Sequence, residues 1–363
     1  MVAVAEHIKV PELRFPEFSG EWEEKRLGKL SEVVTGSTPS TKNNTFFDGS
    51  IPFVTPGDLH EGGVIRVTER TLTELGLAES RSVPKNSIFF SCIGNIGLMG
   101  VANHLCSTNQ QINSLICHHN QSHWFTYYAL SNQAARIEST ANVQVMPMIN
   151  KSDFCEIPLS VPTLPEQQKI AEFLTAVDEK IGKLKRKKEL LEAYKKGAMQ
   201  KLFSQEIRFK DDQGNPYPDW EEKRLGMISN ITTGRLDANA MIVGGQYRFY
   251  TCARDYYSID EFAFDTDALI ISGNGANVGY IHHYHGKFNA YQRTYVLDGF
   301  QEAILYVKYF LNRFLRPRIQ SEKKEGNTPY IVKSTLGDMR IKLPSLPEQQ
   351  KIAEFLTGID DKI

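Results

Sequence analysis

The strongest constraint on the fold is a repeat within the chain. Residues 164–181 read LPEQQKIAEFLTAVDEKI and residues 346–363 read LPEQQKIAEFLTGIDDKI, so 15 of 18 positions are identical at an offset of 182. A second block, WEEKRLG, stands at residues 22–28 and again at 220–226. The order is therefore globule, helix, globule, helix. Such a duplication predicts a pseudo-twofold axis, and duplex DNA is a partner with matching symmetry.

Composition agrees with two globular cores. The chain has 363 residues, of which 41% are hydrophobic and 23% charged, which excludes a disordered chain. No apolar run reaches the roughly 18 residues of a membrane span, and the N-terminus lacks the pattern of a secretory signal. The five cysteines show no CxxC spacing, which is typical of reduced thiols in a cytoplasmic protein. A net charge of −1 leaves room for local basic patches.

The first repeated block opens a long helix. Pro165 suits a first helical turn, and Glu166 suits the positive end of the helix dipole. A helix from Pro165 to about Phe203 would be roughly 57 Å long at ~1.5 Å per residue. Its lysine-rich part, residues 183–201, is interpreted as a solvated face or as a surface for a partner subunit or phosphate. Apolar residues recur four and three apart, as in a coiled-coil seam, at Ile170, Leu174, Val177, Ile181, Leu184 and Leu191.

The second copy of this helix offers Ile352, Leu356 and Ile359 to a seam. Eighteen residues form a weak helix alone, so we expect this copy to pair with the first helix in the antiparallel sense. Relative to the internal repeat, residues 345–363 are expected to be the truncated start of a second spacer helix.

The two globules share further blocks. Ser31–Gly36 matches Ser229–Gly234, and Ser87–Gly97 resembles Ala268–Gly279, each a buried strand that ends in a glycine-asparagine turn. Helices are expected at Trp124–Leu130 and Tyr306–Leu315. The pattern predicts an α+β fold of two similar α/β globules, separated by long coiled-coil spacer helices and related by a pseudo-twofold internal repeat. The expected domains are an N-terminal segment (1–21), a first globule (22–162), a spacer helix (163–205), a second globule (206–344, with a linker at 206–216) and the start of a second spacer (345–363).

No catalytic or metal site is expected. Gly273–Gly279 has the spacing GxGxxxG, which fits no nucleotide-binding loop, and it is interpreted as a structural turn. Histidines at 118–123 and 282–285 offer no tetrahedral ligand set and are interpreted as loop residues. The charged triplets 178–180 and 221–223 are interpreted as helix-surface charges.

Polar side chains suited to reading DNA recur in both globules. Asn and Gln suit the edge of adenine and Arg that of guanine, with ~1–3 kcal/mol of discrimination for each pair of hydrogen bonds. The default interpretation of each candidate is an ordinary polar surface residue, and the neighbouring Gln110 and Gln292 are equally compatible with hydrogen-bonded core amides. The first globule contributes Thr35, Ser37, Thr38, Lys42, Asn43, Asn44, Asn109, Gln111 and Lys151. The second contributes Arg235, Arg248, Arg254, Arg293, Lys323, Lys324, Asn327 and Lys333.

From about Trp22 to Ile363 the chain resembles the specificity subunits of type I restriction-modification enzymes. The resemblance rests on LPEQQKIAEFL before a heptad helix, present twice, each time after a globule that opens with WEEKRLG and a glycine turn. It implies two target-recognition domains, each of which binds one half of a split sequence in double-stranded DNA.

The resemblance also implies that the spacer helices dock two modification subunits, with restriction subunits in the full complex and no membrane partner. Those partner subunits would use S-adenosylmethionine, ATP and magnesium, while this chain would bind no cofactor and catalyse nothing. A stand-alone sequence-specific DNA-binding regulator is the alternative. An undetected nuclease or methyltransferase would need an active site, and a helical scaffold would leave the polar differences between the globules unexplained.

Overall fold

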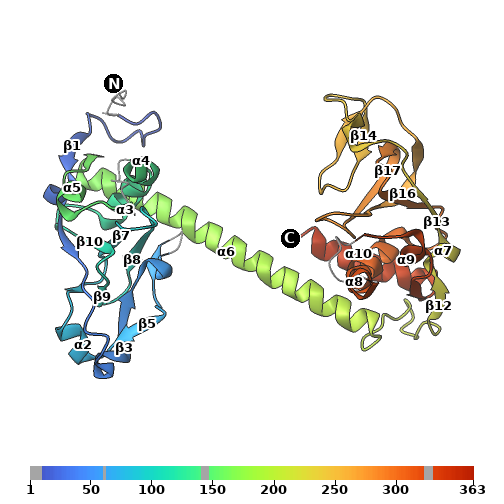
Figure 1. Ribbon diagram of the computed structural model, residues 1–363, viewed down its shortest axis with the longest axis horizontal. Coiled ribbons are helices and arrows are strands. Elements are labelled where there is room, and N and C mark those ends of the chain that lie inside the picture. The colour runs from blue at the N-terminus through green and yellow to red at the C-terminus, as the bar shows by residue number, and fades with distance from the viewer. Residues whose placement is uncertain (1–9, 60–62, 140–146, 323–329) are drawn as a thin grey trace. The chain divides into compact units, whose positions relative to one another are not determined.

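A computed structural model describes residues 10–59, 63–139, 147–322 and 330–363 (Figure 1). The chain divides into two compact units between Lys183 and Leu184. This boundary falls inside one helix, α6 (Leu164–Phe203), so the first turns of α6 belong to unit 1 and its last turns to unit 2. Across the described ranges, no helix is both long enough and apolar enough to cross a membrane.

Unit 1 combines two main sheets with a helical end (Figure 1). A five-stranded sheet has the order β2-β10-β7-β8-β4, and a four-stranded sheet has the order β5-β3-β9-β6. The strands are β1 (Glu23–Arg26), β2 (Ser31–Thr35), β3 (Phe47–Val54), β4 (Val64–Ile65), β5 (Arg70–Leu72), β6 (Ser82–Val83), β7 (Ile88–Ser91), β8 (Met99–Ala102), β9 (Cys106–Thr108), β10 (Ile112–Cys117) and β11 (Pro158–Val161). The helices before α6 are α1 (Leu27–Leu30), η1 (Asn44–Phe46), η2 (Pro56–Asp58), α2 (Glu74–Ala78), α3 (His123–Ser131), α4 (Ala134–Ser139) and α5 (Lys151–Cys155).

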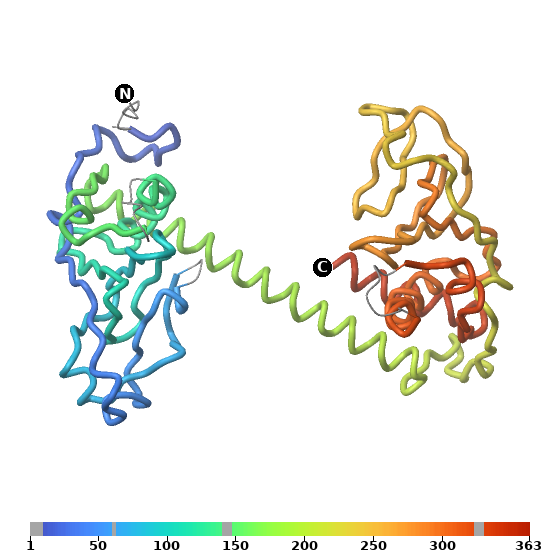
Figure 2. Tube along the Cα trace, in the orientation of Figure 1, coloured from blue at the N-terminus to red at the C-terminus, as the bar shows by residue number. Residues whose placement is uncertain are grey.

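Unit 2 has one large sheet, in the order β13-β18-β16-β17-β14-β15, and a group of helices. In Figure 1 and Figure 2 the segment that contains β14 lies at one end of this unit, and the helices α8, α9 and α10 lie toward the other. The strands are β12 (Glu221–Arg224), β13 (Asn230–Thr233), β14 (Tyr247–Tyr250), β15 (Tyr257–Ile259), β16 (Phe264–Ser272), β17 (Ile281–Ala290), β18 (Thr294–Asp298) and β19 (Arg340–Leu343). The helices are α7 (Leu225–Ile228), η3 (Ala238–Ala240), α8 (Ile304–Glu322), α9 (Lys333–Gly337) and α10 (Leu346–Asp360).

The repeated WEEKRLG block forms the same structure in each unit. Its EEKR part is a strand that pairs antiparallel with the strand before the LPEQQ helix: β1 with β11, and β12 with β19. Its final Leu-Gly begins a one-turn helix whose leucine, Leu27 or Leu225, is fully buried. The block therefore ties the start of each globule to its end.

The core of each unit follows from short apolar strands under a helical layer. In unit 1, β7 is buried at all four positions, and its Phe90 packs on Phe154 of α5 with ring centroids 5.0 Å apart. In unit 2, the buried Leu269 and Ile271 of β16 join one cluster with residues of α8 and α10. Alternating strand residues thus face the helices and set where the loops at the sheet ends emerge.

The antiparallel helix pairing expected from the sequence is present within unit 2. Lys195 Nζ lies 2.5 Å from Asp360 near the end of α10, while Arg208, just beyond α6, contacts Glu348 at the start of α10. The pairing therefore involves the last turns of α6, where Leu202 and Phe203 are buried in the same cluster as Leu356.

Two local expectations about secondary structure are wrong. Residues 221–223 lie on strand β12 and not on a helix, because their pairing with β19 outweighs the helical preference of Glu and Lys. Residues 282–285 lie on strand β17 and not in a loop. His283 pairs there with Asp267 at 2.8 Å. The helices expected at Trp124–Leu130 and Tyr306–Leu315 are confirmed as α3 and α8.

Candidate nucleic-acid interface

The first candidate loop follows β2 and lies against the connection between β9 and β10. The Gly36 N–H donates to the Ile112 carbonyl at 3.0 Å, and the Ser37 N–H donates to the Thr108 carbonyl at 2.8 Å. A Cβ on Gly36 would stand 2.1 Å from the Asn109 carbonyl oxygen. Only glycine allows the two backbones to come this close, so the repeated Thr-Gly dipeptide fixes this loop on its neighbour.

Hydrogen bonds order the polar residues of this loop. Sequence reasoning missed Arg81, whose backbone N–H donates to Ser37 Oγ and whose guanidinium donates to the Thr35 carbonyl, both at 2.9 Å. Arg81 is exposed and supplies a cation to a rim that otherwise carries hydroxyls and amides. The remaining pairs are Thr35 with Asn113 at 2.7 Å, Thr38 with Gln110 at 2.8 Å, and Asn109 with Gln111 at 2.9 Å. The structure therefore gathers Thr35, Ser37, Thr38, Asn109 and Gln111 at one place.

Four other candidates of unit 1 lie elsewhere. Lys42, Asn43 and Asn44 belong to the next turn, where Asn43 Oδ1 caps η1 by accepting from the Thr45 N–H at 3.1 Å. Lys151 begins α5, just after a segment whose Ile149 N–H donates to the Cys92 carbonyl. Lys333 of unit 2 begins α9 in the same way, just after Ile331, whose N–H donates to the Gly273 carbonyl.

The equivalent loop of unit 2 follows β13. A Cβ on Gly234 would stand 1.8 Å from the Ala290 carbonyl oxygen, so this glycine is required for the same reason. The Gln292 N–H donates to the Leu236 carbonyl at 2.9 Å, and its side-chain amide donates to Asp237 Oδ1 at 2.7 Å. Gln292 is thus an exposed amide held in place, not a core amide.

Two exposed arginines flank this contact. Arg235 precedes Leu236 and Arg293 follows Gln292, so the hydrogen bond between Gln292 and Leu236 brings their segments together. The Arg293 carbonyl accepts from the Gly273 N–H at 2.9 Å, which holds its backbone while the side chain remains exposed. Two exposed guanidinium groups at one rim suit bidentate recognition of guanine.

Arg248 on β14 stands in an aromatic cage. Its guanidinium lies 4.3 Å from the ring centroid of Tyr256 and 4.4 Å from that of Tyr284, and it donates to the Tyr250 hydroxyl at 3.4 Å. A cavity of about 520 Å³ opens beside it. Stacking holds the planar guanidinium in one orientation, which preserves its fixed fork of donors. The sequence indicated Arg248 but neither tyrosine: Tyr256 precedes β15 and Tyr284 lies on β17, and strand pairing brings both to Arg248.

Arg254 lines a separate cleft in unit 2, together with Lys195 and residues of α8. The last three candidates, Lys323, Lys324 and Asn327, lie outside the described residues.

A buried carboxylate opens each repeated helix, and the sequence indicated only its favourable place in the dipole. In unit 2 the side chain of Glu348 is fully buried, and Arg208 forms a bidentate pair with it at 3.1 and 2.8 Å. The Trp220 indole N–H donates to the same carboxylate at 3.2 Å. The same three contacts occur in unit 1 among Glu166, Arg14 and Trp22.

The next glutamine and a later aspartate in each LPEQQ helix also make matching bonds. Gln349 Oε1 accepts from the Ala303 N–H ahead of α8, as Gln167 Oε1 does from the Ser122 N–H ahead of α3. The Tyr309 hydroxyl donates to Asp360 at 2.7 Å. Burial is the largest cause that raises the pKa of Tyr309 to about 12, so its hydroxyl stays protonated. Tyr128 and Asp178 form the same pair in unit 1.

The predicted seam residues divide by position. In unit 2, Ile352, Leu356 and Ile359 are buried against the last turns of α6. On α6, Ile170, Leu174 and Leu191 are half-buried. Val177, Ile181 and Leu184 are exposed to 39%, 44% and 51%.

The described residues include no group of three or more His, Cys, Asp or Glu side chains that could hold a metal ion. Burial raises the pKa of both the Cys92 and the Cys106 thiols to about 12, so these cysteines are poor nucleophiles.

Comparison with known proteins identifies the architecture. The family described as "Type I restriction modification DNA specificity domain" matches residues 19–193 and 217–363. The EcoDI specificity subunit of Escherichia coli is 46% identical over 141 residues, which are 38% of this chain and 30% of that relative. The MjaIX specificity subunit of Methanocaldococcus jannaschii is 26% identical over 378 residues, 94% of this chain and 88% of that relative.

A solved structure shows the same fold. The S subunit of a type I restriction-modification system from M. genitalium superposes with a TM-score of 0.71 at 21% sequence identity, over 97% of this chain and 92% of that one. Two family matches therefore cover both units, and each contains the β-sheet, the glycine loop and the start of an LPEQQ helix described above. The chain belongs to the family of type I restriction-modification DNA specificity proteins.

Proposed function

We propose that this chain is the subunit that selects the DNA target of a type I restriction-modification complex and that it has no catalytic activity of its own. One observation carries this proposal: the two units share a scaffold but present different side chains at the same loops. The Gly36 loop displays Thr38 and the amides of Asn109 and Gln111 beside one arginine, Arg81. The Gly234 loop displays two arginines, Arg235 and Arg293, beside one amide, Gln292. Amides suit adenine and guanidinium groups suit guanine, so the two units would read different short sequences.

The proposed target is double-stranded, asymmetric and in two parts. With 40 residues, α6 would be about 60 Å long at ~1.5 Å per residue, which exceeds the ~34 Å of one duplex turn. We propose that α6 acts as a spacer, pairs with the second spacer as a coiled coil about a pseudo-twofold axis, and leaves central base pairs unread. The recurrence of the Glu–Arg–Trp contacts in both units supports such a duplication.

The proposed partners of the spacers are two modification subunits. The exposed apolar residues Val177, Ile181 and Leu184 support a docking role, because a helix that met only water would present polar residues there. A stand-alone DNA-binding regulator would leave these residues without a role. Restriction subunits would complete the complex, and S-adenosylmethionine, ATP and magnesium would be bound by the partners.

Reconstitution tests this division of labour. The purified chain alone, supplied with S-adenosylmethionine, ATP and magnesium, is expected neither to methylate nor to cleave DNA. Addition of a cognate modification subunit is expected to produce adenine methylation, measured by transfer of a labelled methyl group to a duplex. The modification subunit without this chain is the control and should leave the duplex unmodified. Methyl transfer by the isolated chain would overturn the proposal.

A further inference from the structure

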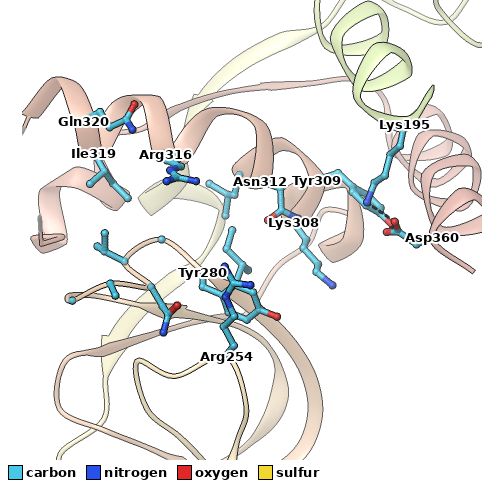
Figure 3. A pocket seen from close by; sticks show the side chains of 17 residues that line it. Lys195, Arg254, Tyr280, Lys308, Tyr309, Asn312, Arg316, Ile319, Gln320 and Asp360 are labelled. Atoms are coloured by element: carbon cyan, nitrogen blue, oxygen red, sulfur yellow. Dashed lines mark hydrogen bonds and ion pairs between the residues drawn. The ribbon is translucent and has the colours of Figure 1, made fainter. Parts of the chain in front are cut away.

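Unit 2 contains a cleft of about 630 Å³ between α8 and the turn that joins β16 to β17 (Figure 3). Lys308, Asn312, Arg316 and Gln320 line it from α8. Since they stand four residues apart, they form one line along the helix, with a step of roughly 6 Å. Figure 3 shows this line on one side and Tyr280 with Arg254 on the other.

The lining is strongly positive. Arg254, Lys308 and Arg316 each bring a cation, and Lys195 enters from α6. Among the described residues of the lining, Asp360 is the one carboxylate, and it already accepts from Lys195 and from the Tyr309 hydroxyl. Desolvation is the main cause that lowers the pKa of Lys308, so an anion placed beside its ammonium would be favourable.

Two of these cations, Arg254 and Lys308, stand where the equivalent positions of unit 1 have residues without positive charge. Strand β3 pairs parallel with β9 in unit 1, as β14 does with β17 in unit 2. Just past each pair the same backbone bond forms: the Asn109 N–H donates to the Val54 carbonyl, and the Tyr291 N–H donates to the Tyr250 carbonyl. Val54 and Tyr250 are therefore equivalent positions. Four residues later, unit 2 has Arg254 where unit 1 has Asp58. Asp58 is buried, and it accepts from the backbone N–H groups of Thr55 and Glu69 at 2.8 and 2.9 Å.

The second difference lies on the helix. The matching hydroxyl–carboxylate pairs Tyr309–Asp360 and Tyr128–Asp178 make Tyr309 equivalent to Tyr128. The residue before each is Lys308 in unit 2 and Tyr127 in unit 1. Both changes add positive charge to unit 2 alone, which indicates a role beyond support of the fold.

We propose that this basic cleft binds backbone phosphates of the DNA duplex, so that unit 2 holds a phosphate-binding site with no equivalent in the described part of unit 1. The inference rests on the proposed function. An evenly spaced line of Lys, Asn, Arg and Gln donors fits the regular repeat of phosphates along a strand, whereas carboxylates on a protein surface are irregularly placed. Phosphate contacts fix the register of a protein on DNA and give binding its dependence on salt.

The test measures the salt dependence of duplex binding by the full-length chain. The variant carries Arg254→Gln, Lys308→Gln and Arg316→Gln, and its affinity for a fluorescent duplex is measured by anisotropy over a series of sodium chloride concentrations. Each lost phosphate contact reduces the slope of log affinity against log salt by about 0.9, so three lost contacts reduce it by about 2.7.

Two matched controls accompany this variant. Arg254→Lys with Lys308→Arg and Arg316→Lys keeps every charge and is expected to keep the slope. Lys210→Gln with Lys342→Gln and Lys362→Gln removes the same charge from exposed positions of unit 2 outside the cleft, and it should also keep the slope. If the triple glutamine variant fails to fold by circular dichroism, the exposed single change Arg316→Gln should still reduce the slope by about 0.9.

The outcomes separate the two proposals. A slope that stays unchanged in the glutamine variants, while the wild-type chain binds duplex, overturns the phosphate site and leaves DNA recognition standing. Unchanged duplex binding together with lost co-purification of modification subunits also overturns it, because the cleft would then face an acidic protein surface. Failure of the wild-type chain to bind any duplex, alone or with modification subunits, contradicts the proposed function itself.

Discussion

At the scale of single residues, the buried Glu348 makes contacts that its short sequence motif does not predict. The sequence placed this glutamate in a first helical turn, where the dipole favours it. The structure adds Arg208 and Trp220, both from the segment between α6 and β12, so the carboxylate holds that segment against α10. Arg208 also donates to the carbonyls of Tyr217 and Pro218. The contact spans 140 residues of sequence, and no local pattern could predict it.

Removal of Arg208 tests this role. Arg208→Ala leaves a buried carboxylate without its cation and is expected to lower the free energy of unfolding of unit 2 by about 3–5 kcal/mol. Arg224→Ala is the matched control. It breaks an exposed ion pair in which the side chains of Arg224 and Asp338 are 62% and 57% exposed. Its loss should lower the free energy of unfolding by at most about 1 kcal/mol.

Urea unfolding followed by Trp220 fluorescence, in a Trp22→Phe and Trp124→Phe background, gives the measurement. Addition of Glu348→Gln to Arg208→Ala should recover part of the loss, because the buried group is then neutral. Equal losses for Arg208→Ala and Arg224→Ala would contradict the account of a buried charge.

The candidate site was predictable only in part at this scale. The Thr-Gly dipeptide and the neighbouring amides were visible because both repeats contain them, and the structure does gather Thr38, Asn109 and Gln111. Arg81 was missed because it reaches the Gly36 loop from a segment 44 residues away. Tyr284 was missed for the same reason, since it lies on β17, far from Arg248 in sequence. Tyr256 stands only eight residues after Arg248, but the antiparallel pairing of β14 with β15 sets their contact, and no short motif marks that pairing.

At the scale of elements, α6 is the best predicted part and also the most instructive. Its length and heptad spacing were readable because apolar residues that recur four and three apart from Ile170 to Leu184 fit a long helix and neither a strand nor a loop. The extent of its pairing was not readable. In unit 2 the last turns of α6 pack on α8 and α10, whereas Val177, Ile181 and Leu184 stay exposed. Short charged strands such as β12 were mistaken for helix, because strand pairing is not a local property.

A charge in the exposed seam should separate docking from folding. Ile181→Asp replaces a residue that is 44% exposed, so we expect the stability of the chain to change by no more than about 0.5 kcal/mol. In contact with a partner the same carboxylate would be buried without a cation. Co-purification with modification subunits is therefore expected to be lost.

Ala176→Asp is the matched control, because it adds the same side chain to an exposed position of α6 outside the seam. Leu174→Asp should act like Ile181→Asp on the complex. If both seam variants still co-purified with modification subunits, this face of α6 would not be the docking surface.

At the scale of the whole molecule, duplication explains both the shared and the different features. The strand pairs β1–β11 and β12–β19, the Glu–Arg–Trp contacts and the glycine loops keep two similar scaffolds. Selection on DNA sequence can then act on the loops alone. Arg254 opposite Asp58, and Lys308 opposite Tyr127, show that charge has also diverged between the copies.

Exchange of one unit should therefore change one part of the target. Replacement of residues 217–344 by the matching segment of a relative is expected to alter one part of the methylated motif and leave the other part and the gap unchanged. Arg293→Ala, which removes an exposed guanidinium at the Gly234 loop, should relax that same part. Thr38→Ala is the counterpart in unit 1 and should affect the other part.

Sequencing of methylated adenines across the genome, in cells with the native chain, with the exchanged chain and with neither, tests the central claim most directly. The account predicts an asymmetric motif of two short parts separated by an unspecified gap, which is lost without the chain and changed in one part only by the exchange. A palindromic or continuous motif, or an exchange that altered both parts, would contradict it.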